Sequence, residues 1–254
     1  MQAGKNLKDS KKAMVFAAGL GTRLKPITNN KPKALAEINH IPLLEIIIRR
    51  LIQFGFHDIV VNVHHFSDQV VQFIRQKNNF GVNIMISDES DLLLDTGGGL
   101  QKARLFLAGK SPILLHNVDI LTNLDYSKME EYHLQQNALA TVAVRNRRSS
   151  RYLLFDEDNQ LCGWENTLTH EVKLPVPTVP LINLAFSGVH FVSPDIFTHL
   201  HDTGPYSIIT KYLDLAVSSK IMGYIHNDDF WMDLGKPEHL QTASGLYNQY
   251  IADL

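Results

Sequence analysis

The first 120 residues alternate between short apolar runs and longer stretches in which apolar positions recur with helical spacing. The apolar runs predict four strands, at residues 13–17, 58–63, 82–86 and 112–116. The helical spacing predicts helices at residues 42–54, 67–77 and 96–107, with Ser67 as the N-terminal cap of the second. Strands that alternate with helices indicate a mainly parallel sheet covered by helices, in which ligands bind beyond the carboxyl ends of the strands.

The pattern changes in the second half of the chain. Shorter apolar runs predict strands at residues 138–145, 151–155, 160–164, 183–192, 221–225 and 230–235. Helical spacing predicts helices at residues 195–201, 206–218 and 236–250, and the proline-bearing segment 171–180 is expected to be an extended loop. No internal repeat or long linker divides the sequence. We therefore expect a single α/β domain with a mixed, mainly parallel sheet flanked by helices.

Composition and charge narrow the range of partners. The net charge is −2, and no run approaches the roughly 18 to 20 apolar residues that cross a bilayer. We therefore expect no nucleic acid and no membrane as partners, and an anionic substrate would need a local positive patch. The single cysteine is typical of a reducing compartment, so we expect a cytoplasmic protein. We also expect residues 1–12 to be flexible and the protein to be a monomer or a small homo-oligomer.

The segment from Gly19 to Lys33 supplies such a patch. Two close glycines allow backbone N–H groups to cradle a phosphate, and four cations and no carboxylate lie between Arg23 and Lys33. A dinucleotide-binding turn would need a third glycine at Leu24 and an immediate helix, which the prolines of this segment prevent. The segment is therefore predicted to be a long flexible phosphate loop, with a solvated surface loop as the alternative.

This segment resembles the signature of sugar-1-phosphate nucleotidyltransferases, GxGTRLxPxT followed by PKxL. The matching residues are Gly19-Leu20-Gly21-Thr22-Arg23-Leu24-Lys25-Pro26-Ile27-Thr28 and Pro32-Lys33-Ala34-Leu35. The resemblance covers essentially the whole chain and implies a Rossmann-like, glycosyltransferase-A-like fold. It implies that Arg23 and Lys33 are catalytic residues that contact phosphates. It implies a nucleotide-binding role for Ala17, Ala18, Gly19, Gly21 and Thr22.

Two aspartates are candidate metal ligands. Asp119 follows a predicted strand at the expected ligand edge, and Asp233 lies in the apolar segment 230–235. A carboxylate among apolar neighbours is costly to bury unless it is paired or metal-bound, and Mg²⁺ is often held by one or two carboxylates plus phosphate oxygens. Each aspartate alone could instead cap a turn or helix. The resemblance supports a Mg²⁺ site, although Val118 stands where the family usually has glycine.

A third landmark is the triple glycine within Leu94-Asp95-Thr96-Gly97-Gly98-Gly99. Glycines at a helix start permit either ligand approach or close packing. The resemblance implies nucleotide contacts from Thr96, Gly97 and Gly98, and from Asn117 at the end of a predicted strand. Within the family, the segment is most similar to N-acetylmuramate 1-phosphate uridylyltransferases, with mannose- or heptose-1-phosphate guanylyltransferases as the alternative.

The predicted sugar-phosphate site carries the weakest match. Many relatives have a Glu-Lys-Pro segment whose lysine holds the sugar phosphate, but this sequence reads Glu165-Asn166-Thr167. Glu165, Ser187 and Gly188 are the candidate sugar-phosphate residues, with a plain core strand as the alternative for the last two. The four arginines at residues 145–151 are interpreted as a solvated turn, from which a sugar-phosphate contact remains an alternative.

Taken with the resemblance, the sequence predicts a Mg²⁺-dependent nucleotidyltransferase that joins a nucleoside triphosphate to a sugar 1-phosphate. The expected pair is UTP with N-acetylmuramate 1-phosphate, in peptidoglycan recycling. Residues 13–120 would form the nucleotide-binding half and residues 121–254 the sugar-phosphate half. The alternatives are GTP with mannose or heptose 1-phosphate, a non-sugar phosphate acceptor such as choline phosphate, and a non-catalytic nucleotide-sensing subunit.

Overall fold

A mixed sheet of ten strands forms the centre of the structure, a computed structural model that describes residues 10–250, with side chains for residues 10–246. The strands are β1 (Lys11–Phe16), β4 (Phe56–Val63), β5 (Asn83–Asp88), β6 (Ile113–Asn117), β8 (Ala140–Arg145), β9 (Arg151–Phe155), β10 (Leu161–Asn166), β11 (Glu171–Lys173), β12 (Ile182–Val192) and β13 (Ile221–Ile225). In space they follow the order β11-β10-β9-β12-β6-β1-β4-β5, and β8 pairs with both β12 and β13.

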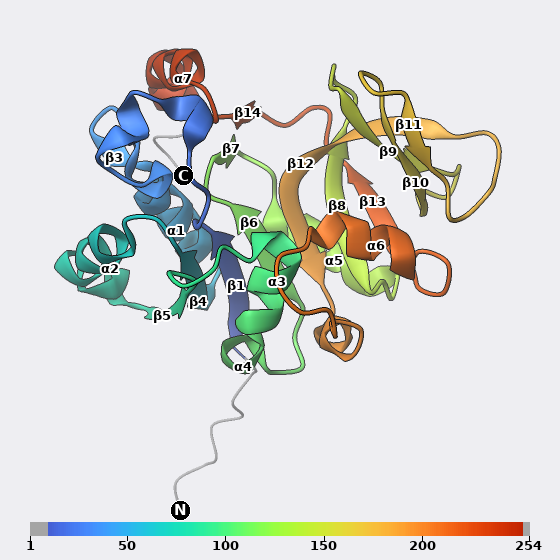
Figure 1. The fold of residues 1–254 in the computed structure, drawn as a ribbon, viewed down its shortest axis with the longest axis horizontal. Coiled ribbons are helices and arrows are strands. Elements are labelled where there is room, and N and C mark those ends of the chain that lie inside the picture. The colour runs from blue at the N-terminus through green and yellow to red at the C-terminus, as the bar shows by residue number, and fades with distance from the viewer. Residues whose placement is uncertain (1–9, 251–254) are drawn as a thin grey trace, which may run out of the picture.

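One half of the sheet is parallel. Strand β1 lies parallel to β4 and β6, and β4 lies parallel to β5. The carboxyl ends of these four strands therefore meet at one edge of the sheet, which we call the carboxyl edge. Strand β12 runs antiparallel to β6, β8 and β9. It joins the parallel half to the half built from β8 to β13, and the two halves lie side by side in Figure 1.

Helices cover both faces of the sheet (Figure 1). The helices are α1 (Leu43–Gln53), α2 (Ser67–Gln76), α3 (Asp95–Lys102), α4 (Arg104–Leu107), α5 (Tyr126–Gln135), α6 (Ile208–Leu215) and α7 (Pro237–Tyr250). Alternate residues of β1 enter two hydrophobic clusters. Ala13 and Val15 pack in a cluster that includes α1 and α5, whereas Met14 and Phe16 pack in a cluster that includes α3 and α6. This alternation follows from the two-residue repeat of a strand that is buried on both faces.

Short elements lie beyond the carboxyl edge. Strand β7 (Ile120–Thr122) pairs antiparallel with β14 (Trp231–Asp233), and β2 (Glu37–Ile38) pairs with β3 (Ile41–Pro42). The 3-10 helices η1 (Thr22–Leu24), η2 (Ile27–Asn29) and η3 (Lys33–Leu35) lie in the segment after β1. Two others, η4 (Asn78–Gly81) before β5 and η5 (Pro194–Thr198) after β12, lie at the opposite edge of the sheet. The β7–β14 pair brings residues far apart in the sequence above the end of β6 (Figure 1).

The predicted fold class, a single α/β domain with a mixed sheet flanked by helices, is confirmed. The predicted bounds of β9 and β13 agree with the structure. The missed elements include the two-residue strands β2 and β3, the strand β7, the helix α5 and the edge strand β11, which lies inside the predicted extended loop. Helix α5 escaped the pattern because few of its residues are apolar. Its start is fixed by Asp125, whose side chain accepts hydrogen bonds from the backbone N–H groups of Ser127 and Lys128.

Three local predictions were wrong. Residues 1–9 lie outside the described part, but Lys11 and Lys12 belong to β1 rather than to a flexible segment. Ser67 is not a cap, because it is the first helical residue of α2 and Phe66 occupies the cap position without a capping side chain. The predicted helix at 96–107 is divided at Ala103, where ψ is −2°, into α3 and α4.

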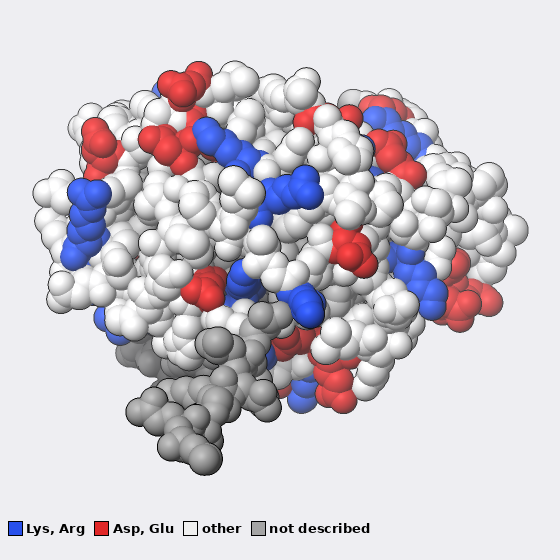
Figure 2. All heavy atoms as spheres, turned by 90° about the horizontal axis from the view of Figure 1, so that it is seen from below, with Lys and Arg blue, Asp and Glu red and all other residues white. Residues whose placement is uncertain are grey.

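Charge is mixed on the face seen from below, away from the carboxyl edge. Figure 2 shows Lys and Arg side chains among Asp and Glu side chains there, outside the part that grey atoms cover. A positive region for an anionic ligand must therefore be sought elsewhere. Within the described residues, no helix combines the length and apolar character needed to cross a bilayer.

Candidate functional site

The segment after β1 is folded into short turns rather than forming the long flexible loop that the sequence predicted. Gly21 has φ of +64°, and a Cβ there would lie 2.9 Å from Thr28 Cγ2, so a larger residue would be strained. Leu24 is fully buried, and the Thr28 hydroxyl donates a 2.8 Å hydrogen bond to the Gly21 carbonyl. As expected, Pro26 and the turns around it prevent a long helix. These contacts hold the loop in a compact conformation.

The start of this loop presents free backbone donors. Asn62 Oδ1, at the end of β4, accepts hydrogen bonds from the N–H groups of Ala17 and Ala18 at 2.7 and 3.3 Å. In the part of the chain that the structure describes, the N–H groups of Gly19, Leu20 and Gly21 have no hydrogen-bond acceptor. Successive free N–H groups form a concave site for anions. Donors for a phosphate are therefore available at residues 19–21, whereas those of Ala17 and Ala18 are already used.

A buried carboxylate that the sequence analysis missed supports Asn62. Glu89 is 0% exposed, and its carboxylate accepts hydrogen bonds from Asn62 Nδ2 at 2.7 Å and from the N–H of Leu94 at 3.0 Å. The Leu94 segment leads into α3. Glu89 thus connects β4, the β1 loop and the start of α3. Two signals were present in the sequence: a polar Asn within the apolar run of β4, and an acidic residue just after β5.

A pocket of about 380 Å³ opens among these elements. We call it the carboxyl-edge pocket. Its lining residues are Phe16, Ala18, Gly19, Asn62, Glu89, Leu93, Asp95, Thr96, Asn117, Asp119 and Pro205. Five of the predicted site residues meet here, namely Ala18, Gly19, Thr96, Asn117 and Asp119. Its volume falls within the roughly 300–1,000 Å³ typical of small-ligand sites.

The triple glycine of α3 serves packing instead of lining this pocket. A Cβ on Gly97 would lie 2.2 Å from the Tyr206 ring, and one on Gly98 would lie 2.6 Å from the Gly204 carbonyl oxygen. A Cβ on Gly99 would lie 2.7 Å from Glu89 Oε1. Gly97 and Gly98 pack closely against the segment before α6 and do not line this pocket, and the nucleotide contacts implied for them stay a prediction. Thr96 does reach the pocket, and its Oγ1 accepts a 3.0 Å hydrogen bond from the N–H of Ile208.

The two predicted metal ligands lie side by side. The N–H of Leu234, next to Asp233, donates a 2.8 Å hydrogen bond to the Asp119 carbonyl, as an extension of the β7–β14 pair. Asp119 forms an ion pair with Lys33, and Asp233 Oδ2 lies 3.9 Å from Arg23 NH1. The predicted cations and carboxylates therefore converge as two opposite-charge pairs.

This arrangement suits a magnesium ion shared with a phosphate ligand. Among the described residues, no group of three or more His, Cys, Asp or Glu side chains is placed to hold a metal. Two carboxylates, one from the turn between β6 and β7 and one from the end of β14, fit Mg²⁺, because this ion commonly takes one or two carboxylates and completes its shell with phosphate oxygens and water. Such a site would bind Mg²⁺ together with its anionic substrate.

Arg147 is also part of the site, although its segment was interpreted as a solvated turn. Its guanidinium lies 4.4 Å from the centre of the Trp231 ring and donates a 3.0 Å hydrogen bond to the Phe186 carbonyl. Its Nε is buried and has no partner among the described residues. Burial lowers the pKa of Arg147, and the negative charge of Asp233 opposes that shift. A positive charge therefore lies between β12 and the metal-ligand candidates.

The predicted sugar-phosphate residues are only partly placed for that role. Ser187 is 0% exposed, and its Oγ lies 2.7 Å from His226 Nε2, so its side chain holds β12 to the segment after β13. Gly188 has φ of +77°, and a Cβ there would lie 2.6 Å from Ile120. Its requirement for glycine is therefore structural. Glu165 is half-buried and accepts a hydrogen bond from Asn183.

Comparisons with known proteins find relatives of the whole chain. A family model described as Nucleotidyl transferase matches residues 12–249. N-acetylmuramate alpha-1-phosphate uridylyltransferase from Caulobacter vibrioides is 32% identical over 89% of this chain and 92% of that protein. Mannose-1-phosphate guanyltransferase 2 from Candida glabrata is 29% identical over 95% of this chain and 66% of that protein. A structure of UDP-glucose pyrophosphorylase from Acinetobacter baumanii has the same fold, with a TM-score of 0.75 at 17% identity over 94% of this chain and 93% of that one.

Proposed function

This chain belongs to the nucleotidyl transferase family, and we propose that it transfers a nucleoside monophosphate from a nucleoside triphosphate to a sugar 1-phosphate. The products are a nucleotide-sugar and pyrophosphate. One observation carries the proposal: free N–H donors at residues 19–21 lie at the same edge as the Lys33–Asp119 and Arg23–Asp233 pairs. A triphosphate needs the donors and cations, and its metal ion needs the carboxylates.

The two charge pairs suggest how the site receives its substrate. Both carboxylates are paired with cations in this structure. We infer that Lys33 and Arg23 turn to phosphate oxygens when the triphosphate binds, while Asp119 and Asp233 hold Mg²⁺. The metal ion would supply positive charge at the phosphate oxygens. Lys33 would stabilise charge at the α-phosphate and Arg23 charge on the leaving pyrophosphate.

The reaction needs no general base. An oxygen of the sugar 1-phosphate, already ionised near neutral pH, attacks the α-phosphorus, and the bond from that phosphorus to the pyrophosphate oxygen breaks. The barrier is repulsion between anions and their alignment, so positioned cations account for catalysis. We propose that Arg147 supplies the charge that the missing Glu-Lys-Pro lysine gives in relatives. Its half-buried guanidinium near Asp233 and β12 supports this role.

The proposed division of labour follows the two halves of the fold. Residues 13–120 would bind the nucleotide in the carboxyl-edge pocket, and residues 121–254 would bind the sugar phosphate. We propose UTP with N-acetylmuramate 1-phosphate as the substrate pair, on the basis of the Caulobacter vibrioides relative. GTP with mannose 1-phosphate is the second candidate, on the basis of the Candida glabrata relative.

Pyrophosphate release with Mg²⁺ tests this proposal. UTP, GTP, CTP, dTTP and ATP are each combined with the 1-phosphates of N-acetylmuramate, mannose, glucose and heptose. We expect release with UTP and N-acetylmuramate 1-phosphate, and no release from an Asp119→Asn variant. Asp228→Asn is the matched control, because Asp228 is exposed and away from the pocket lining. Nucleotide binding by folded protein without release from any pair would contradict catalysis and indicate a sensing subunit.

A further inference from the structure

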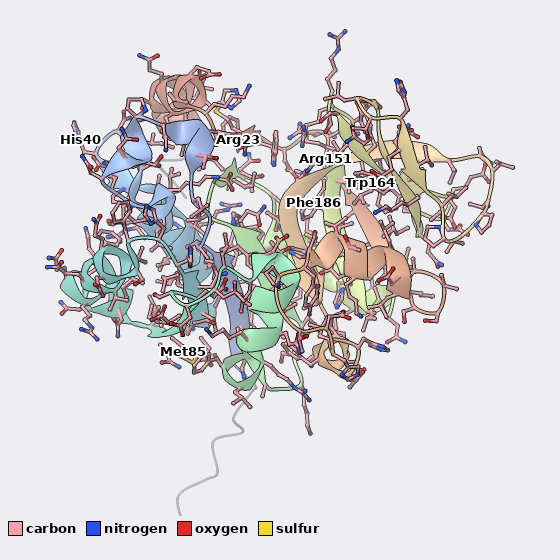
Figure 3. All side chains as sticks on the ribbon, in the orientation of Figure 1. Arg23, His40, Met85, Arg151, Trp164 and Phe186 are labelled. Atoms are coloured by element: carbon pink, nitrogen blue, oxygen red, sulfur yellow. The ribbon has the colours of Figure 1, made fainter. Side chains whose placement is uncertain are left out.

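A second pocket lies on the half of the sheet that we assign to the sugar. It has a volume of about 390 Å³ and is bounded by β9 to β12 and by α6. We call it the side pocket. The residues that matter here are Arg151, Trp164, Lys173, Phe186, Ser207 and Thr210. Figure 3 shows Arg151, Trp164 and Phe186 close together above α6, with Arg23 on the opposite half.

Strand register places the large side chains on one face. Trp164 of β10 is directly opposite Leu153 of β9 and Lys173 of β11. Side chains that oppose each other across a ladder share a face, and so do residues two apart along a strand. Arg151, two residues before Leu153, therefore joins this face. Leu184 of β12 also opposes Leu153, and Phe186 lies two residues further on. The face is thus an apolar floor with two cations at its edge.

The charge of the side pocket is unbalanced. None of its lining residues is an Asp or Glu. The Arg151 guanidinium has no hydrogen bond or ion pair with any described residue. Lys173 Nζ lies 5.6 Å from the centre of the Trp164 ring and 3.4 Å from the exposed carboxylate of Glu171. A free guanidinium beside aromatic rings suits a small anion attached to a less polar skeleton.

The side pocket adjoins the carboxyl-edge pocket. Pro205 lines the carboxyl-edge pocket and Ser207 lines the side pocket, so one short segment forms a wall of each. The next residue, Ile208, is tied by its N–H to Thr96 of the carboxyl-edge pocket. Phe186 of the side pocket packs edge-on against His190, which stacks on Phe16 of the carboxyl-edge pocket. The two pockets therefore share the segment 205–207 as a common wall.

From these contacts we infer that the side pocket binds an acidic substituent on the sugar ring of the substrate. Arg151 and Lys173 select a sugar 1-phosphate that carries a carboxylate besides its phosphate, and Trp164 and Phe186 contact the less polar part of that substituent. This inference rests on the proposed function, because it assumes that the ligand of the second half is a sugar phosphate. N-acetylmuramate 1-phosphate has such a carboxylate, on an ether group that N-acetylglucosamine 1-phosphate lacks.

Calorimetric titration with two nucleotide-sugars tests the inference. UDP-N-acetylmuramate and UDP-N-acetylglucosamine differ only in the acidic ether group. We expect the acidic ligand to bind about 10- to 100-fold more tightly, as a charge-assisted hydrogen bond allows. An Arg151→Gln, Lys173→Gln double variant should lose that preference and keep its affinity for UDP-N-acetylglucosamine. Both side chains are exposed, so the changes should leave the fold intact. Arg148→Gln is the matched control, because it removes a nearby exposed charge that does not line the side pocket.

Turnover of the corresponding sugar 1-phosphates with UTP separates this inference from the proposed function. Equal binding of the two ligands by the natural protein would overturn the inference, even if pyrophosphate is released. The inference would also be overturned if the double variant lost affinity for UDP-N-acetylmuramate and UDP-N-acetylglucosamine equally. The two cations would then bind a part that both ligands share, and not the carboxylate. A preference for the acidic ligand that the double variant abolishes, without any pyrophosphate release, would support the inference and contradict the proposed function.

Discussion

Lys33 and Asp119 are each only 13% exposed, so their ion pair is more shielded from water than the Arg23–Asp233 pair, whose side chains are 60% and 34% exposed. A shielded charge is costly unless an opposite charge accompanies it. Asp119 can exchange Lys33 for a metal ion, and Lys33 can exchange Asp119 for a phosphate. The pair is therefore stable without substrate and remains available for both tasks.

Replacing Lys33 with alanine should slow turnover by roughly 10²- to 10³-fold, the usual effect of removing one group that stabilises developing charge. Steady-state kinetics with saturating substrates measures this change. Lys25→Ala is the control, because Lys25 lies in the same loop, is exposed and has no ion pair among the described residues. Near-normal turnover by Lys33→Ala would remove Lys33 from the catalytic set.

Replacing Gly188 with alanine should destabilise the protein and disturb the pocket. The new Cβ would lie 2.6 Å from Ile120 and 3.0 Å from Asn117 Nδ2, in a backbone conformation that favours glycine. We expect a loss of about 1–3 kcal/mol in the free energy of unfolding, measured by urea denaturation. Gly109→Ala is the control, because a Cβ there would meet only the flexible end of Lys12. Unchanged stability of Gly188→Ala would show that β12 can shift locally.

At the scale of elements, Glu89 fixes the geometry of the carboxyl edge. It joins Asn62 of β4 to the segment before α3, and Asn62 in turn holds the β1 loop through Ala17 and Ala18. Three walls of the carboxyl-edge pocket thus depend on one buried carboxylate. Its location explains why Gly99 has no side chain, since a Cβ would meet the carboxylate oxygen.

Glu89→Ala should raise the KM for the nucleoside triphosphate and leave the KM for the sugar 1-phosphate nearly unchanged. Two donors, the buried Asn62 Nδ2 and the part-buried Leu94 N–H, would lose their acceptor, at up to about 1–3 kcal/mol each. Kinetics at varied concentrations of each substrate separates the two effects. Asp91→Ala, an exposed change nearby, serves as the control. A change confined to the sugar KM would contradict this assignment.

The sequence allowed the strand-and-helix framework to be predicted because apolar periodicity reports burial directly. It also located Arg23, Lys33, Asp119 and Asp233, which the structure brings together in pairs.

The features that the sequence pattern did not reveal depend on contacts between distant parts of the chain. Helix α5 is started by a side-chain cap and has few apolar residues. The sequence left close packing and ligand approach open for the triple glycine, and only the fold shows that Tyr206, Gly204 and Glu89 pack against it. The sequence indicated a solvated charge at Arg147, because its contact with Trp231, 84 positions further along the chain, exists only in the fold.

At the scale of the whole molecule, buried histidines link stability to pH. Burial lowers the pKa of His190 to about 3 and that of His133 to about 4, from an ordinary value of 6.5. His190 Nδ1 lies 2.7 Å from the Tyr212 hydroxyl, and His133 Nδ1 lies 2.9 Å from the Thr141 hydroxyl. Both rings therefore remain neutral in the folded protein at pH values where the unfolded chain is protonated.

Because the unfolded state binds these protons first, stability is complete above pH 6.5 and falls as the pH drops toward 4. Each ring should remove up to about 1.4 kcal/mol of unfolding free energy per pH unit in that window. Urea denaturation at pH 7.5, 6 and 5 measures the slope. A His133→Asn variant should have a shallower slope, and His40→Gln, which changes an exposed ring, should not. Equal slopes for the natural protein and His133→Asn would exclude His133 as a source of the pH dependence.

The central claim is that the bond between the α-phosphorus and the pyrophosphate oxygen breaks, and that the α-phosphate stays on the nucleoside and becomes joined to the phosphate of the sugar. UTP labelled with ³²P at either the α- or the γ-position, mixed with N-acetylmuramate 1-phosphate, Mg²⁺ and the protein, tests it directly. We predict that the α-label appears in the nucleotide-sugar and the γ-label in pyrophosphate, with neither product formed by Asp233→Asn. Release of the γ-label as inorganic phosphate, or persistence of both labels in UTP, would contradict the account.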